Sequence, residues 1–179
     1  MTCLHERTAK RNINVRGIAD KLIYSKAECE CPLYKETGKE RKIVMIAIVC
    51  LDDQDGMMFN RRRQSRDREV VSRILNLCEG SRLWMHPCSE PLFHEEMTQN
   101  IHVDEQFLLR AGEGEYCFVE SVGLKEMEER LEKLIIFRWN RRYPADLRLD
   151  LCLQDWKKTE EEEFAGHSHE KITKEVYER

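Results

Sequence analysis

Two segments of the chain combine arginine, asparagine and aspartate, which are side chains suited to holding an anion. They span residues 52–67 and 138–146. A guanidinium group presents a planar fork of donors that matches phosphate or carboxylate oxygens. A helix that begins near residue 65 would add backbone N–H donors and the positive end of its dipole. The residues that we expect to bind a ligand are Asn60, Arg62, Arg63, Ser65, Asp67, Asn140, Arg142 and Asp146.

Three functions fit these segments. The first is binding or processing of a phosphate-bearing ligand, either RNA or a nucleotide. The second is a small-molecule enzyme, and the third is a non-catalytic protein whose arginine-rich loop docks an acidic partner. In the alternative interpretation the arginines are solvated surface, and a pair such as Arg142 and Asp146 only ties a loop. The sequence leaves open whether the protein is an enzyme, and it does not indicate an oligomeric state.

Other motifs for catalysis, metals or cofactors are missing. No Gly-x-Ser-x-Gly elbow and no glycine-rich phosphate loop occurs, so no catalytic residue is assigned. His86, Cys88 and His94 lie close in sequence, but their spacing matches none of the usual paired zinc patterns. We therefore expect neither a metal nor a cofactor.

Composition indicates a single domain that works in the cytoplasm. The chain has 179 residues, of which 41% are apolar, and a net charge of −4. The net negative charge argues against nucleic-acid binding over the whole surface, because counterion release needs concentrated positive charge. No apolar run approaches the roughly 20 residues that cross a bilayer, and no secretory signal is visible. The eight cysteines are therefore expected as free thiols, and no membrane partner is expected.

The pattern of apolar residues predicts strands that alternate with helices. The continuous apolar run 43–51 is typical of a strand buried on both faces. A helix with Ser65 or Asp67 as its cap follows, and further strands are expected at 83–85, 101–103, 107–109, 116–120 and 134–139. A second helix is expected over 124–134 and an antiparallel edge strand over 147–153.

These elements predict an α/β fold with one three-layer domain. Its central sheet is expected to be mostly parallel, with an antiparallel edge strand and helices on both faces. We expect an unstructured N-terminal extension over residues 1–41, the α/β domain over 42–156, and an acidic, flexible tail over 157–179. His167 and His169 fall in that tail and are expected to lie away from the core.

Residues 45–155 resemble a family of short, uncharacterised bacterial proteins, some of which carry the name ribonuclease Z. The segments that carry this resemblance are 53–60, 62–67, 116–120 and 138–146. The name implies RNA processing at a two-metal site, which that enzyme class builds from a His-x-His-x-Asp-His run. The nearest sequence here, His167-Ser168-His169-Glu170-Lys171, lacks the aspartate and the third histidine.

A weaker similarity links the chain to the dihydrofolate reductase fold. There too a first strand runs through an acidic, glycine-containing turn into a helix, and a late strand–helix–strand unit is followed by an antiparallel strand. Glu120 and Ser121 stand where that family has two glycines against its nicotinamide cofactor. This resemblance implies the architecture, and it underlies the alternative of a small-molecule enzyme.

Residues 1–41 supply no periodic apolar face for packing. A chain that starts at Met45 is therefore expected to keep the thermal stability of the full chain, measured by circular dichroism. A large drop in melting temperature would show that the removed segment packs on the core.

Overall fold

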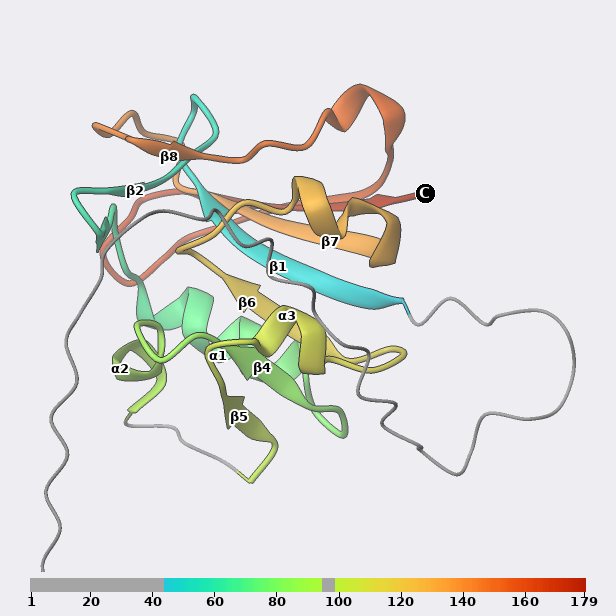
Figure 1. The fold of residues 1–179 in the computed structure, drawn as a ribbon. Coiled ribbons are helices and arrows are strands. Elements are labelled where there is room, and N and C mark those ends of the chain that lie inside the picture. The colour runs from blue at the N-terminus through green and yellow to red at the C-terminus, as the bar shows by residue number, and fades with distance from the viewer. Residues whose placement is uncertain (1–43, 95–98) are drawn as a thin grey trace, which may run out of the picture. The chain divides into compact units, whose positions relative to one another are not determined.

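The computed structural model describes residues 44–94 and 99–179, so the expected N-terminal extension over 1–41 lies outside the described residues. Figure 1 shows the described elements. The strands are β1 (Met45–Leu51), β2 (Gly56–Phe59), β3 (Arg62–Arg63), β4 (Leu83–Met85), β5 (Ile101–Val103), β6 (Tyr116–Val119), β7 (Leu131–Arg138), β8 (Leu147–Arg148), β9 (Lys157–Phe164) and β10 (Ile172–Glu178). The helices are α1 (Arg68–Leu77), α2 (Glu90–Phe93) and α3 (Phe107–Arg110), with 3-10 helices η2 (Lys125–Arg130) and η3 (Leu153–Asp155).

The main sheet of the described chain is mixed. Its strand order is β5-β4-β6-β1-β7-β10-β9, and a smaller sheet has the order β3-β2-β8. Strands β5, β4, β6, β1 and β7 pair in parallel. Strand β10 pairs antiparallel with both β7 and β9. The fold is therefore α/β, and the carboxyl ends of β4, β6, β1 and β7 lie along one edge of the sheet (Figure 1).

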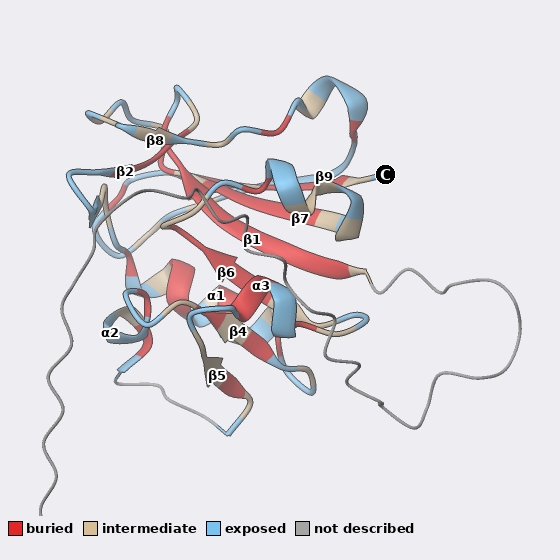
Figure 2. Cartoon of the chain, in the orientation of Figure 1, coloured by how far each residue is buried: buried red, intermediate tan, exposed pale blue. Residues whose placement is uncertain are grey.

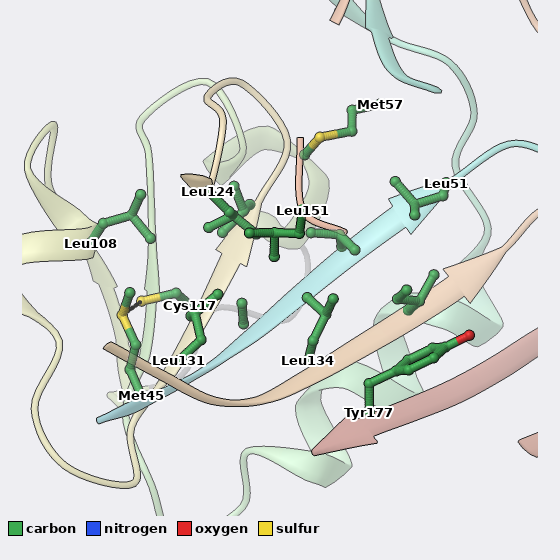
Figure 3. Packing of buried hydrophobic residues seen from close by; sticks show 14 of the residues in the cluster. Met45, Leu51, Met57, Leu108, Cys117, Leu124, Leu131, Leu134, Leu151 and Tyr177 are labelled. Carbon is green, nitrogen blue, oxygen red and sulfur yellow. Dashed lines mark hydrogen bonds between the residues drawn. The ribbon is translucent and has the colours of Figure 1, made fainter. Parts of the chain in front are cut away.

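Strand β1 is buried on both faces, which explains its continuous apolar run. Met45, Ala47, Val49 and Leu51 belong to one core cluster, part of which is drawn in Figure 3. Ile46, Ile48 and Cys50 belong to a second cluster, together with Val70, Val71 and Ile74 of α1. Alternate residues of a strand point to opposite faces, so β1 joins the two clusters. Figure 2 shows β1, β6 and much of β7 as buried.

The helix after β1 begins where the sequence predicts. Asp67 caps α1 by accepting a hydrogen bond of 2.9 Å from the backbone N–H of Glu69. Its extended backbone and short carboxylate are typical of an N-cap residue. Of the two expected caps, Asp67 is therefore the one used.

The prediction of a flexible tail over 157–179 is wrong. These residues form β9 and β10, and β10 pairs with β7 over Thr173–Glu178. Ile172, Val176 and Tyr177 are buried in the two core clusters. The domain therefore extends to the end of the described chain.

Charge explains why the pattern of β9 was missed. All but the last of its residues, in the sequence KKTEEEEF, are exposed, so no apolar alternation marks it as a strand. Charged side chains are common on edge strands, where they oppose pairing with other chains. Here they also face cations, because Lys174 lies 3.5 Å from Glu160 and Arg73 lies 2.8 Å from Glu162.

Three smaller predictions differ from the structure. Residues 124–134 divide between the short helix η2 and the start of β7, instead of forming one helix. Residues 107–109 lie in α3. Of residues 147–153, only Leu147 and Arg148 form a strand, and it belongs to the small sheet with β2. The antiparallel edge of the main sheet comes from β10 and β9 instead.

No helix of the described chain is long and apolar enough to cross a membrane.

The position of β10 predicts that Ile172→Ala will destabilise the protein by about 2–5 kcal/mol, because it removes a fully buried side chain. Lys157→Ala, on the exposed strand β9, should change the free energy of unfolding by less than about 0.5 kcal/mol. Urea denaturation measures both values. Equal and negligible effects would mean that β10 does not pack on the core.

Candidate functional site

Polar side chains gather where the parallel strands end. Asp52, directly after β1, accepts hydrogen bonds from the backbone N–H of Gln54 (2.8 Å), Gly56 (2.7 Å) and Tyr143 (2.9 Å). Burial would raise the pKa of Asp52, but these backbone hydrogen bonds lower it below its usual value. The carboxylate thus fixes both the turn after β1 and the loop after β7, and it places Tyr143 at this edge.

Asp67 is buried and accepts several hydrogen bonds besides the one from its own helix. The backbone N–H groups of His167 and Ser168 donate to its two oxygens at 2.8 and 2.7 Å, and the Ser168 hydroxyl donates at 2.9 Å. Burial alone would raise the pKa of Asp67, but these bonds and one from His169 hold it well below the usual range. Asp67 is therefore a carboxylate that only accepts hydrogen bonds.

His169 is buried between Asp67 and two hydroxyl groups. Its Nδ1 lies 3.0 Å from a carboxylate oxygen of Asp67, and its Nε2 lies 3.0 Å from Ser65 Oγ and 3.5 Å from Tyr143 Oη. The ring stacks on Trp139, which follows β7, with centroids 4.9 Å apart. Because Asp67 can only accept, Nδ1 carries the proton. In the neutral ring, Nε2 is then an acceptor that faces Ser65 and Tyr143.

The turn between β9 and β10 approaches Asp67 very closely. A side chain at Gly166 would place its Cβ 2.6 Å from Asp67 Oδ2 and 2.7 Å from Ile172 Cδ1. Only glycine leaves room for the carboxylate there. This glycine lets the turn that carries His169 close over the start of α1.

A second buried group lies at the end of β6. The Glu120 carboxylate accepts a hydrogen bond of 2.8 Å from the Ser89 hydroxyl and lies 3.4 Å from Arg63 Nη2. Burial raises the pKa of Glu120, and the Arg63 charge and the Ser89 hydrogen bond offset only part of that rise. Arg63 Nη2 also donates to the Cys88 carbonyl at 3.0 Å. Its Nη1 is buried without a hydrogen-bond partner among the described residues.

Two clefts border the segment from β3 to α1. One, of about 520 Å³, is lined by Phe59, Asn60, Arg62, Arg63, Gln64, Tyr143 and Pro144. The other, of about 420 Å³, includes Arg66, Asp67, His94, His167 and Ser168. Ser65 lies in the chain between Gln64, which lines the first cleft, and Arg66, which lines the second.

The structure does not bring the residues predicted to bind a ligand into one set of contacts. Ser65 and Asp67 contact His169, and Arg63 contacts Glu120. The backbone N–H of Asn60 donates to Asp146 at 2.8 Å, so this pair joins the turn after β2 to the segment before β8. Asn140 donates to the Thr173 hydroxyl at 3.0 Å. Arg62 and Arg142 are exposed.

The two aspartates of the predicted site hold groups other than arginine. Asp67 holds a histidine and backbone N–H groups, and Asp146 holds the N–H of Asn60. Strand β1 pairs in parallel with β7, so the segments that follow these two strands begin at the same edge of the sheet. Whether these residues bind an anion stays a prediction.

Sequence reasoning missed Glu120, Tyr143 and His169 as members of this site. Tyr143 and Glu120 lay inside segments that were singled out, but neither carries a motif that distinguishes it. His169 was assigned to a tail away from the core, yet it is one of the buried polar residues. Among residues 44–94 and 99–179, no three His, Cys, Asp or Glu side chains gather to hold a metal ion.

Asp67 should stabilise the protein through its charge. Asp67→Asn is expected to lower the free energy of unfolding by about 1.5–3 kcal/mol at neutral pH, because it weakens several hydrogen bonds to a carboxylate. The folded pKa lies below the unfolded one, so this contribution is present above about pH 4 and is lost as the pH falls further. Urea titrations of both proteins from neutral to acidic pH measure it. A difference that persists undiminished in acid would contradict this role.

Comparisons with known proteins establish the fold of this chain but not its function. No family model matches the chain, and no curated protein matches it. Among solved structures, the chain is similar to a dihydrofolate reductase from Enterococcus faecalis complexed with NADP(H) and RAB-propyl. The TM-score is 0.57 at 12% sequence identity, over 77% of this chain and 97% of that one. The chain therefore has a fold like that of dihydrofolate reductase.

Proposed function

We propose that the protein is a small-molecule enzyme that uses acid–base groups at the carboxyl edge of its sheet. The observation that carries this proposal is the buried Asp67–His169 pair. Its remaining nitrogen, Nε2, faces Tyr143, and Tyr143 lines the cleft that also contains Arg63. An imidazole oriented by a carboxylate is a common general base or acid.

The cleft supports a ligand with an apolar part and an oxygen-rich part. Phe59 lines it and is 42% exposed, so it offers an apolar surface for a planar or hydrocarbon group. Arg63 lines the cleft as well, and its side chain is 22% exposed, so its guanidinium group offers a charged donor there. A small carboxylate or phosphate ester would satisfy that donor and keep its apolar part against Phe59.

The fold likeness supports an enzyme of this architecture more than it supports binding of RNA. In open α/β sheets, ligands bind outside the carboxyl ends of the strands, and the buried residues Asp52 and Glu120 directly follow β1 and β6 there. The likeness is to a small-molecule enzyme, although fold alone does not determine function.

The residues at the end of β6 do not fit a nicotinamide cofactor, which the similar reductase was solved with. A dinucleotide needs close approach to the backbone at a glycine-rich turn. Here the corresponding residues are Glu120, which is buried against Ser89 and Arg63, and Ser121. A carboxylate at this place would also repel a pyrophosphate group if it is ionised. We therefore derive no step through that cofactor.

Arg63 should contribute to ligand binding and Arg61 should not. A thermal-shift screen of small carboxylates and phosphate esters, each beside a neutral isostere, would identify anionic ligands. For a ligand so found, Arg63→Gln should weaken binding by about tenfold to a hundredfold, because it removes a charge-assisted contact. Calorimetry on the folded variants measures this loss.

Arg61→Gln is the matched control, because Arg61 is exposed and is not among the residues that line the cleft. It should change the affinity by less than about twofold. The proposal fails if no small anion stabilises the parent protein. It also fails if the two substitutions weaken binding equally.

A further inference from the structure

We propose that Ser65 is a nucleophile, activated by His169 and Asp67, that transfers the acyl group of a small ester. This inference rests on the proposed function and names its reaction class. It starts from the chain of contacts Asp67 Oδ2 to His169 Nδ1 (3.0 Å) and His169 Nε2 to Ser65 Oγ (3.0 Å). A hydroxyl, an imidazole and a carboxylate in this order are the parts of a nucleophilic triad, whatever their sequence order.

The protonation states favour this use of Ser65. Asp67 has no proton to donate, so it holds the Nδ1–H tautomer of His169. In that tautomer the free lone pair of Nε2 points to the serine hydroxyl, which must then be the donor. The base is therefore within hydrogen-bond distance of the proton that it would remove.

Two neighbouring groups complete the chemistry. Tyr143 Oη lies 3.5 Å from the same Nε2, so a hydroxyl donor stands beside the reacting atoms and can stabilise a developing oxyanion. Trp139 stacks on the imidazole and limits its rotation. Ser65 itself is half-buried, whereas His169 and Asp67 are buried. The nucleophile is thus the most accessible member of the triad.

Ser168 supplies an internal comparison. It also touches His169, but on the other side of the ring, 3.1 Å from Nδ1. Its hydroxyl donates to the Asp67 carboxylate at 2.9 Å, and Nδ1 already carries a proton. The imidazole therefore cannot accept the proton of Ser168, which faces only the weakly basic carboxylate. The geometry therefore predicts one reactive serine and one unreactive serine within the same cluster.

The proposed reaction has two balanced steps. Ser65 Oγ attacks the ester carbonyl carbon and its proton moves to His169 Nε2. The bond from carbon to the leaving oxygen then breaks, and the leaving alcohol takes that proton. Water attacks the acyl-serine, gives its proton to Nε2, and the released Ser65 oxygen recovers it as the carboxylic acid leaves. The substrate class is a small ester whose anionic group binds Arg63.

The experiment treats the full chain with a fluorophosphonate probe, followed by intact mass spectrometry and peptide mapping. One label per chain is expected, on Ser65, formed at least about a hundredfold faster than on Ser168, because a general base contributes about that factor or more. Labelling of Ser168 at a similar rate, or no labelling of Ser65, overturns the inference.

Variants give a second readout that does not depend on mapping. Ser65→Ala should abolish the label, and Ser168→Ala should retain labelling at Ser65. p-Nitrophenyl acetate should give a burst of one p-nitrophenolate per chain with the parent protein and none with Ser65→Ala. A burst that survives Ser65→Ala overturns the inference. If Ser65 stays unlabelled but an anionic ligand still binds in a way that depends on Arg63, the role of Ser65 as a nucleophile is wrong. The proposed function then stands.

Discussion

The carboxylate of Asp67 is the interaction on which the site depends. It caps α1, accepts the backbone N–H groups of the turn between β9 and β10, and orients His169. Because these partners lie about one hundred positions apart in sequence, this one group joins the start of α1 to the end of the chain. A buried carboxylate is costly unless it is fully hydrogen-bonded, so the same contacts that stabilise the fold also fix the geometry of the imidazole.

The sheet determines where that geometry can act. Parallel pairing of β1 with β6 and β7 brings their carboxyl ends to one edge, and the loops that follow carry Asp52, Glu120 and Trp139 there. Arg63 reaches this edge from β3 and lies beside Glu120. The strand order thus brings these polar groups to one edge of the sheet. The two apolar clusters on either side of β1 hold the strands in place. The proposed chemistry uses groups whose positions the fold already requires.

Local patterns predicted the elements that are buried or capped. The apolar run of β1, the cap at Asp67 and strands β4 and β6 follow from burial, side-chain chemistry and strand length, and the structure contains them. Strand β9 was not predicted because its side chains are charged and exposed, and no local pattern reveals its antiparallel pairing with β10. Of the predicted site residues, Asn60, Arg62 and Arg63 line one cleft, and Ser65 and Asp67 contact His169. Their partners Glu120 and His169 could not be predicted, because those contacts require knowledge of the sheet order and of β10.

The tautomer of His169 tests the central claim most directly. Two-bond proton–nitrogen correlation spectra of the ¹⁵N-labelled chain, recorded at mildly alkaline pH, distinguish a proton on Nδ1 from one on Nε2. The account predicts that His169 carries its proton on Nδ1, and that Asp67→Asn removes this preference. A proton on Nε2 in the parent protein would contradict the account, because His169 would then donate to Ser65 and Asp67 would not orient it.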